Sequence, residues 1–350
     1  MKLILSDVPG RKAVRRAGEA MRDGDFGDEA LDAVSRWRLA HAYPLELARA
    51  ILTRRLHALG IGDALTAMRL KRLPSIALKL RRFDGMCLDR MQDIGGIRVI
   101  VGSVEEAHRL EDALLQGRCR HDLPDPHDYI SHPKSDGYRG IHQIFRIRSI
   151  AHPELDGLAV ELQIRTRLEH SWATAVEAMD FISGSSLKSG GGDEDARRFF
   201  ALSSALFALE EKAPLPSYAE GMAREDLAAA LARLEQSSGL LARLEGQAIA
   251  SGHVEEPCRN IRGWRVMLLD TGARRLCLTP FIKAQLPLAG VLYAALERRF
   301  MDDSGKAAVL ISSGDLKEIR KAYPNYFLDA SAFTRRIRRI ARQGARPARR

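Results

Sequence analysis

The chain has 350 residues, a formal net charge of +10 and a sequence pI near 9.6. Its length allows one large domain or two of ordinary size, and 45% apolar with 29% charged residues is ordinary globular composition. No apolar stretch approaches the ~20 residues that cross a bilayer and no signal peptide is expected, so we predict a cytoplasmic protein with polyanionic partners, either nucleoside triphosphates or RNA.

Residues 1–64 are predicted to be an N-terminal helical region, because apolar residues recur at helical spacing on both sides of a break at Pro44. Residues 65–182 mix strand and helix patterns. Segments rich in β-branched residues predict strands at 96–101, 140–147 and 158–166, and helical spacing predicts helices at 104–116 and 167–181. This order predicts an α/β (α+β) fold in which a β-sheet is flanked by helices.

A polar, glycine-rich loop at 183–195 opens a helical connector that spans residues 183–254. Leucines at near-heptad spacing in 227–244 favour packing inside the chain, although a partner-binding seam would show the same pattern. Residues 255–350 are predicted to be a smaller C-terminal α/β module with a strand hairpin, a helix and a further strand. Its arginine-dense tail is typical of a phosphate-binding segment and also of a solvated terminus.

Cations gather in the segment 69–82, which includes Arg69, Lys71 and Lys79. We interpret positions 71, 75, 78, 79 and 82 as one side of a helix, so that several cations converge. Converging cations suit a triphosphate, whose charges must be neutralised together, but a solvated basic helix face would look alike.

Two carboxylates stand close to predicted strands. Asp93 precedes the strand 96–101, while Glu161, Gln163 and Arg165 alternate with apolar residues and therefore share one face of the strand 158–166. Such carboxylates can hold Mg²⁺ against phosphate oxygens. Phosphoryl-type transfer needs little beyond this positioning and the neutralisation of charge by nearby cations.

The loop that leads into the strand 140–147 carries Lys134, Tyr138, Arg139 and His142 around a Pro-Lys-Ser-Asp-Gly turn. An aromatic ring beside cations can stack on a base while the cations hold phosphates. A solvated turn with a half-buried tyrosine is the alternative for this segment taken alone.

Four motifs follow one another in order, namely RxKxxxSIxxK, DIGGIRV, DYIxxPKxxGYxxIH and ELQIRT. Together they resemble the synthetase domain of the RelA/SpoT family, over about a third of the chain. The resemblance implies a nucleotidyltransferase-like mixed sheet with flanking helices. It also implies Mg²⁺-dependent transfer of pyrophosphate from ATP to a 3′-hydroxyl.

The resemblance also assigns roles to individual residues. Arg69 would stack on the adenine of ATP, and Tyr138 would stack on the acceptor base. The residues implied to bind ATP are Arg69, Lys71, Ser75, Lys79 and Arg98. The residues implied to be catalytic and to hold Mg²⁺ are Asp93 and Glu161. The residues implied to bind the acceptor are Lys134, Tyr138, Arg139, His142, Gln163 and Arg165.

Finer details resemble the small toxic members of the family, above all the fused toxin–antitoxin CapRel type of anti-phage defence. That likeness implies pyrophosphorylation of the tRNA 3′-CCA end and inhibition in cis by the module 255–350. A Tyr-x-x-Tyr motif, here Tyr323 and Tyr326, would block the ATP site until a phage protein releases it. The alternatives are a (p)ppGpp synthetase that acts on GDP or GTP, and an enzyme that uses an adenine nucleotide as acceptor.

Departures from the family pattern bear on this choice. His127 stands where conventional alarmone synthetases often carry lysine or arginine, which leaves the acceptor open. Among the first 65 residues, His41 and His57 are the histidines and no His-Asp pair follows, so a hydrolase is not expected. A non-catalytic relative that binds RNA or a partner would have lost its metal carboxylates or donor-site cations, and the sequence retains them.

Overall fold

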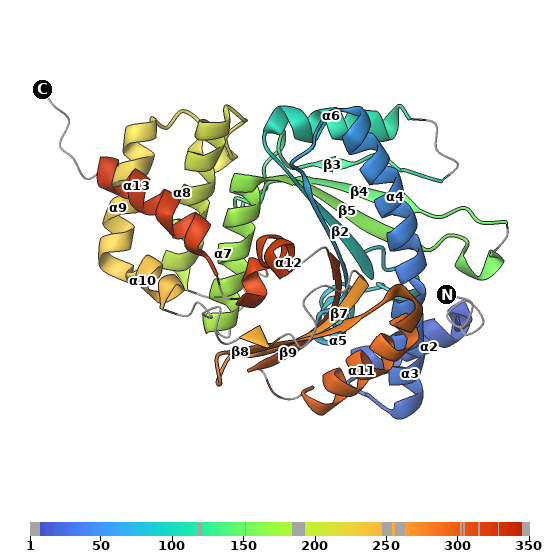
Figure 1. Ribbon diagram of the computed structural model, residues 1–350. Coiled ribbons are helices and arrows are strands. Elements are labelled where there is room, and N and C mark those ends of the chain that lie inside the picture. The colour runs from blue at the N-terminus through green and yellow to red at the C-terminus, as the bar shows by residue number, and fades with distance from the viewer. Residues whose placement is uncertain are drawn as a thin grey trace, which may run out of the picture.

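The computed structural model describes residues 8–117, 121–150, 152–183, 193–246, 254–255, 263–301, 303, 305–313, 316–327 and 329–344. Over these ranges the chain forms one nine-stranded sheet with helices on both faces (Figure 1). The strands are β1 (Leu65–Leu70), β2 (Gly95–Val101), β3 (His127–Asp128), β4 (Ile141–Arg146), β5 (Ala159–Thr166), β6 (Val254–Glu255), β7 (Gly263–Asp270), β8 (Arg275–Phe281) and β9 (Lys306–Ser313). The spatial order is β3-β4-β5-β2-β1-β9-β7-β8-β6.

The helices lie before, between and after these strands along the chain. The α-helices are α2 (Arg11–Asp23), α3 (Asp28–Ala40), α4 (Ala42–Ala58), α5 (Leu73–Arg82), α6 (Val104–Leu115), α7 (Arg167–Ser183), α8 (Glu194–Glu211), α9 (Arg224–Ser238), α10 (Leu240–Glu245), α11 (Leu286–Arg299), α12 (Leu316–Ala322) and α13 (Ser331–Gly344). Short 3₁₀ turns include η4 (Ser217–Ala219) and η7 (Pro324–Phe327). No described helix is long and apolar enough to cross a membrane.

The prediction of a mixed sheet with flanking helices is confirmed. β2 and β5 pair in parallel, as do β6 and β8, while the other pairs are antiparallel. The predicted break at Pro44 was wrong, because the two helices separate at His41 and Pro44 lies in the first turn of α4. Proline is tolerated there, since a first-turn N–H has no partner within the helix.

The interpretation of residues 71–82 as one helical face was also wrong. Arg69 belongs to strand β1, Lys71 lies in the turn after it, and α5 begins only at Leu73. Pro74 at the second helical position fixes that start, because proline suits the first turn of a helix and not its interior. The cations still converge, but they do so where a strand, a turn and a helix meet.

The C-terminal residues are α/β, as predicted, but their strands continue the same sheet. β9 pairs with β1 through Met68 with Ser312 and Arg69 with Ile311, and β7 then pairs with β9. This pairing covers the edge that β1 would otherwise present to solvent. The predicted module 255–350 therefore shares its sheet with the N-terminal half.

Two cores lie on different sides of this sheet. Buried apolar residues of α4, α6 and α11 pack on one face, and the opposite face carries polar residues, α7 and α12 (Figure 1). On its other side, α7 packs with α8, α9, α10 and α13 into a helical bundle. The leucine stripe packs inside this bundle as favoured, and Gly239, with φ of 61°, divides the expected single helix into α9 and α10.

The arginine-dense tail is partly a packed helix. Phe333, Ile337 and Ile340 on one side of α13 are buried in the bundle, while arginines on the other side, such as Arg335 and Arg339, are exposed. Residues 345–350 lie outside the described residues.

Candidate active site

Polar residues form two rows across the sheet face that carries α12. The rows follow from strand register, because residues paired between neighbouring strands lie side by side on one face. One row contains His142 of β4, Gln163 of β5 and Arg98 of β2; the next contains Glu161 of β5, Gly96 of β2 and Arg69 of β1. The predicted shared face of Glu161 and Gln163 is confirmed, because their apolar neighbours Leu162 and Ile164 lie in the opposite core.

These rows form the floor of a cavity of about 220 Å³, which we call the small cavity. Gly96 lies between Glu161 and Arg69, and a Cβ at this position would meet no atom within 4 Å. The missing side chain therefore leaves open space in the middle of a charged row. The predicted residues that line the small cavity are Arg69, Lys71, Asp93, Arg98, His142, Glu161 and Gln163.

Asp93 lies between two lysines. Lys71 Nζ is 2.7 Å from Asp93 Oδ2, and Lys79 Nζ is 2.9 Å from Asp93 Oδ1. Burial opposes ionisation of Asp93, but the two ammonium charges outweigh it and hold the pKa of this carboxyl below its ordinary value. Burial lowers the pKa of Lys71, with Asp93 acting against the shift. Asp93 is thus an anion whose charge is shared by two cations.

Glu161 is held at both oxygens. His142 Nδ1 lies 2.9 Å from Oε1, and Gln163 Nε2 donates to Oε2 at 2.6 Å. Burial would raise the pKa of Glu161, but the hydrogen bond and charge of His142 dominate and lower it to about 2. Glu161 is therefore ionised at neutral pH and is a weak base.

The donor set of the small cavity fits Mg²⁺. Two ionised carboxylates, Asp93 and Glu161, line one polar space, with lysine and arginine side chains around them. Mg²⁺ is commonly bound in proteins by one or two carboxylates together with substrate phosphates and water. These two residues could hold the ion, and the surrounding cations could hold the phosphates.

The small cavity is covered by α12 and η7, residues 316–327, which we call the cover (Figure 1). Tyr323 forms part of the cavity wall, and both Tyr323 and Tyr326 are buried. Arg98 Nη1 donates to the carbonyl of Ala322 at 3.0 Å, and its guanidinium lies 5.8 Å from the centre of the Tyr323 ring. A predicted ATP-binding arginine is thus engaged by the C-terminal segment.

A further contact fixes the cover to α7. His170 Nε2 donates to the carbonyl of Lys321 at 2.9 Å. Burial and the nearby charges of Arg98 and Arg165 lower the pKa of His170 to about 3, so its ring is neutral at pH 7. The cover is held by hydrogen bonds to its backbone and by the burial of its aromatic side chains.

A second cavity of about 890 Å³, the large cavity, adjoins the small one and shares His142 and Gln163 with it. Lys134, Tyr138 and Arg165, three of the residues predicted to bind the acceptor, line it. Arg165 Nη2 donates to the hydroxyl of Tyr138 at 2.9 Å, and that hydroxyl also bonds His142 Nε2. One hydrogen-bonded chain therefore runs from the large cavity to Glu161.

The large cavity includes residues that sequence reasoning missed. Its aromatic wall also contains Trp172, Phe200 and Tyr218, and two arginines of α8, Arg197 and Arg198, lie along it. Trp172 stands in the helix after the last motif and reads as a core residue. The others lie beyond the motifs, with no spacing that would connect them to the site.

Three of the predicted donor and acceptor residues, Arg139, Ser75 and Lys79, line neither cavity. Lys79 is connected to the small cavity through its ion pair with Asp93. Arg139 is buried and forms ion pairs with Glu169 at 3.2 Å and Glu211 at 2.8 Å, so it ties α7 to α8. It follows Tyr138 directly and points elsewhere, since neighbouring side chains in extended backbone face opposite ways. Ser75 lies in the first turn of α5, outside the residues that line the small cavity.

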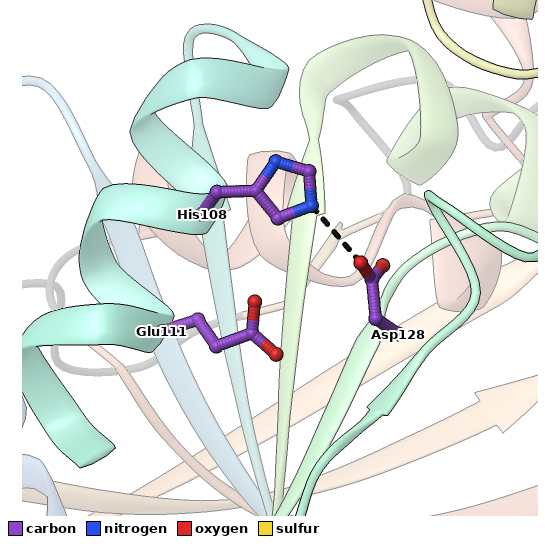
Figure 2. A group of neighbouring side chains, drawn as sticks. All are labelled: His108, Glu111 and Asp128. Carbon is purple, nitrogen blue, oxygen red and sulfur yellow. Dashed lines mark hydrogen bonds and ion pairs between the residues drawn. The ribbon is translucent and has the colours of Figure 1, made fainter.

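A separate polar group lies on α6 and β3, where His108 and Asp128 face each other with Glu111 beside them (Figure 2). His108 Nε2 is 3.1 Å from Asp128 Oδ2. The other oxygen of Asp128 accepts from the amides of Ile130 and Ser131 at 2.8 and 3.0 Å. These bonds use both oxygens of Asp128 to shape the loop after β3.

Comparison with known proteins agrees with the motifs. Residues 68–181 match the model of the region found in RelA / SpoT proteins, which confirms the resemblance for this part of the chain. An uncharacterized protein of Mycobacterium tuberculosis, Rv1366, is 31% identical over 169 residues, 48% of this chain and 57% of that protein. The GTP pyrophosphokinase YjbM of Bacillus subtilis is 29% identical over 117 residues, 32% of this chain and 54% of that protein. The chain thus spans little more than half the length of these relatives.

Solved structures give a partial likeness. The small alarmone synthetase 2 of Bacillus subtilis is 19% identical with a TM-score of 0.43, over 50% of this chain and 92% of that one. The small alarmone synthetase 1 of the same organism, solved with its product pppGpp, is 23% identical with a TM-score of 0.42, over 51% of this chain and 92% of that one. The fold is therefore described from the strand order of this chain and not from these structures.

Proposed function

We propose that this chain transfers pyrophosphate from ATP to the 3′-hydroxyl of a nucleotide, at the junction of its two cavities. The main support for this proposal is the position of the charged side chains. Two ionised carboxylates and several cations line the small cavity, which meets the large cavity at His142 and Gln163. A donor in one cavity and an acceptor in the other would bring the reacting groups together at that junction.

The phosphates of ATP would lie in the small cavity, where Arg69 and Lys71 line the wall and Lys79 pairs with Asp93, so that these cations neutralise the phosphate charge. Mg²⁺ held by Asp93 and Glu161 would supply further neutralisation and lower the pKa of the attacking hydroxyl. The acceptor oxygen attacks the β-phosphorus, the bond from that phosphorus to the α-phosphate oxygen breaks, and AMP leaves. Glu161 takes the hydroxyl proton, while His142 and Gln163 keep its carboxylate in place.

The cover gives the site an inhibited state. At about 220 Å³ the small cavity is below the roughly 300–1,000 Å³ of typical ligand sites, and Tyr323 is part of its wall. Tyr323 and Tyr326 are the motif from which cis inhibition was expected. We therefore propose that ATP enters when the cover moves away. The resemblance to CapRel-type proteins implies that a phage protein triggers this movement.

For the acceptor, we propose GDP or GTP first. Relatives that carry a named activity over the matched region are GTP pyrophosphokinases, YjbM and YwaC of Bacillus subtilis. The tRNA 3′ end is the second candidate, and the large cavity favours it. Its three further aromatic residues and the arginines of α8 extend past the acceptor residues, as a stacking platform for several bases would.

The test is a transfer assay with γ-labelled ATP and Mg²⁺, with GDP, GTP and deacylated tRNA offered in parallel to the full chain and to Tyr326→Ala. Label on guanine nucleotides supports the first acceptor, and label on tRNA alone supports the second. Asp93→Asn and Glu161→Gln keep the side-chain shapes but remove the charges, so both should abolish transfer. Undiminished transfer in either variant, or silence of both parent forms with every acceptor, would contradict the proposal.

A further inference from the structure

A buried ion pair connects the N-terminal and C-terminal parts of the chain beside the small cavity. Arg38 of α3 and Glu297 of α11 are separated by 259 residues in sequence, and their side chains are only 2% and 4% exposed. Arg38 Nη2 donates to Glu297 Oε2 at 2.6 Å. Tyr293, also on α11, accepts from Arg38 Nη1 at 3.1 Å, and the guanidinium lies 4.7 Å from the centre of its ring.

This group, Arg38, Tyr293 and Glu297, which we call the clamp, holds the backbone on either side of Arg72. Arg38 Nη1 donates to the carbonyl of Lys71 at 3.1 Å. Glu297 Oε1 accepts from the amide of Leu73 at 2.8 Å. The clamp therefore forms backbone hydrogen bonds at both ends of the turn that carries Lys71, whose side chain pairs with Asp93.

The bond to Leu73 also orients α5. Leu73 is the first residue of this helix, and the side chain of its N-cap residue, Arg72, does not cap the helix. The first amides of a helix lack partners within it, and the positive end of the helix dipole favours an anion there. Glu297 thus caps α5 from a distant helix, and Lys79, two turns along α5, pairs with Asp93.

Helix α11 packs directly against α3 near the clamp. Gly290 lies where α11 crosses α3, and a Cβ on it would come within 2.9 Å of Leu39. The nearest atoms belong to the end of the Leu39 side chain, which would have to shift to admit a side chain at this position. Figure 1 shows α11 lying beside α3, on the side of the molecule away from the helical bundle.

We infer that Arg38, Glu297 and Tyr293 are positioning residues for the donor half of the proposed transfer. They act through Lys71 and α5 and do not touch the substrate. Both lysines that pair with Asp93 depend on the clamp, and errors of about 1 Å in such a site can cost on the order of 10²-fold in rate. Because this role presupposes the proposed function, its test has one readout that does not require turnover.

The C-terminal part of the chain has two opposite effects on the small cavity. The residues 255–350 supply the cover that blocks the small cavity, and they also supply Glu297, which holds the lysines of that cavity in place. Loss of the cover alone should free the enzyme, whereas loss of the clamp should disable it. The C-terminal part is therefore a component of the donor site as well as its inhibitor.

The experiment uses the full chain with Arg38→Met and Glu297→Met combined. Replacing both members of a buried ion pair with apolar residues is often neutral for stability, so this variant should fold and melt close to the parent. The matched control combines Arg336→Met and Glu210→Met, which removes an ion pair between α13 and α8 far from Lys71. A third variant, Arg38→Met with Glu297→Gln, restores an oxygen acceptor for the Leu73 amide without any charge.

Hydrogen exchange of the segment 71–80 is the first readout. We expect it to be about tenfold faster in the double-methionine variant, unchanged in the control, and partly restored by the glutamine variant, since one bond to an amide is recovered. The second readout is the split of KM values in the Tyr323→Ala background. KM for ATP should rise about tenfold, with the acceptor KM within about twofold, because the clamp supports the donor side.

The two proposals can fail separately. Parental exchange at 71–80 in the double-methionine variant would overturn the clamp, whether or not the chain turns over ATP. The clamp would also be overturned if an active double-methionine variant had the same KM for ATP as the Tyr323→Ala parent. An equal rise in the KM values for ATP and for the acceptor would overturn it as well. If faster exchange accompanies a parent that transfers nothing, the clamp stands as a hold on the Lys71 turn and the proposed function fails.

Discussion

The C-terminal part of the chain touches the small cavity in two contrasting ways. The clamp grips the Lys71 turn with a buried ion pair, and each of its charged side chains also bonds a backbone group of that turn. The cover relies on bonds from Arg98 and His170 to backbone carbonyls and on aromatic burial. Among the described residues, two polar atoms of the cover, the hydroxyl of Tyr323 and Oδ1 of Asn325, are buried without a hydrogen-bond partner, and so is one of the clamp, Nε of Arg38.

From this difference we expect the clamp to stay in place and the cover to be displaceable. A buried polar atom without a partner costs about 1–3 kcal/mol, which moving the cover into water would recover. Breaking the clamp would instead leave a charge unpaired in the interior. We therefore expect changes at the clamp to affect stability and donor binding, and changes at the cover to affect access to the site.

The largest expected effect is at the clamp. Arg38→Ala leaves Glu297 buried without its partner, so it should lower the free energy of unfolding by about 3–5 kcal/mol, measured by urea denaturation. Arg336→Ala breaks a half-exposed ion pair with Glu210 and should cost less than about 1 kcal/mol. Equal losses in the two variants would remove the contrast between the buried clamp and a partly exposed ion pair.

The second-largest expected effect is the opening of the cover at acidic pH. The pKa of His170 is about 3 in the closed form, and moving the cover away exposes the ring and returns the pKa toward its ordinary 6.5. Protonation therefore favours the open form, starting below about pH 6.5 and growing until about pH 3. At pH 5 the bias should be ~2 kcal/mol.

Hydrogen exchange of residues 316–327, corrected for the intrinsic pH dependence of exchange, measures this opening. Arg98, Arg165 and Glu177 also face His170, so His170→Gln provides the control. It keeps a donor for the carbonyl of Lys321 but does not titrate, and the acid-induced opening should disappear. The same pH response in both proteins would assign the effect to another group.

Substitutions at Tyr323 should move ATP affinity in opposite directions. Tyr323→Ala removes the ring from the wall of the small cavity, and we expect a non-hydrolysable ATP analogue to bind about tenfold more tightly, because more of the protein is in the competent form. Tyr323→Phe removes an unpartnered hydroxyl and should stabilise the closed form by about 1 kcal/mol, which weakens binding about fivefold. Equilibrium dialysis would show whether the two shifts have the expected opposite signs.

The smallest effect distinguishes two neighbouring glycines. A Cβ on Gly96 meets no atom, so Gly96→Ala should fold normally but weaken ATP binding about fivefold by filling the cavity floor. A Cβ on Gly95 would lie 2.9 Å from Val160 and 3.1 Å from Leu45, so Gly95→Ala should lower the melting temperature and leave the cavity unchanged. Dialysis and thermal unfolding of both variants measure these effects, and a shared loss of stability would contradict the placement of Gly96.

Local patterns were sufficient to predict much of the site. Period-two alternation placed Glu161 and Gln163 on one face because a strand has that geometry. The same logic applied without a strand boundary misled at Lys71, where Pro74 decides the helix start. Arg139 was misassigned because charge and proximity to Tyr138 do not show the direction in which a side chain points.

Other features depend on contacts between distant segments and leave no local signal. The pairing of β9 with β1 joins strands more than two hundred residues apart, and the bond of Arg38 to Glu297 spans 259 residues. The motif containing Tyr323 suggested a contact with the ATP site only through resemblance. Clamp residues look like an ordinary helical arginine and glutamate until the fold brings them together.

Hydrogen exchange of the full chain, with and without a non-hydrolysable ATP analogue and Mg²⁺, tests the central claim most directly. If the cover excludes ATP while the clamp supports its site, the analogue should speed exchange at 316–327 and slow it at 71–80. Slower exchange at both segments would contradict the claim, because residues 316–327 would then be a lid that closes over ATP.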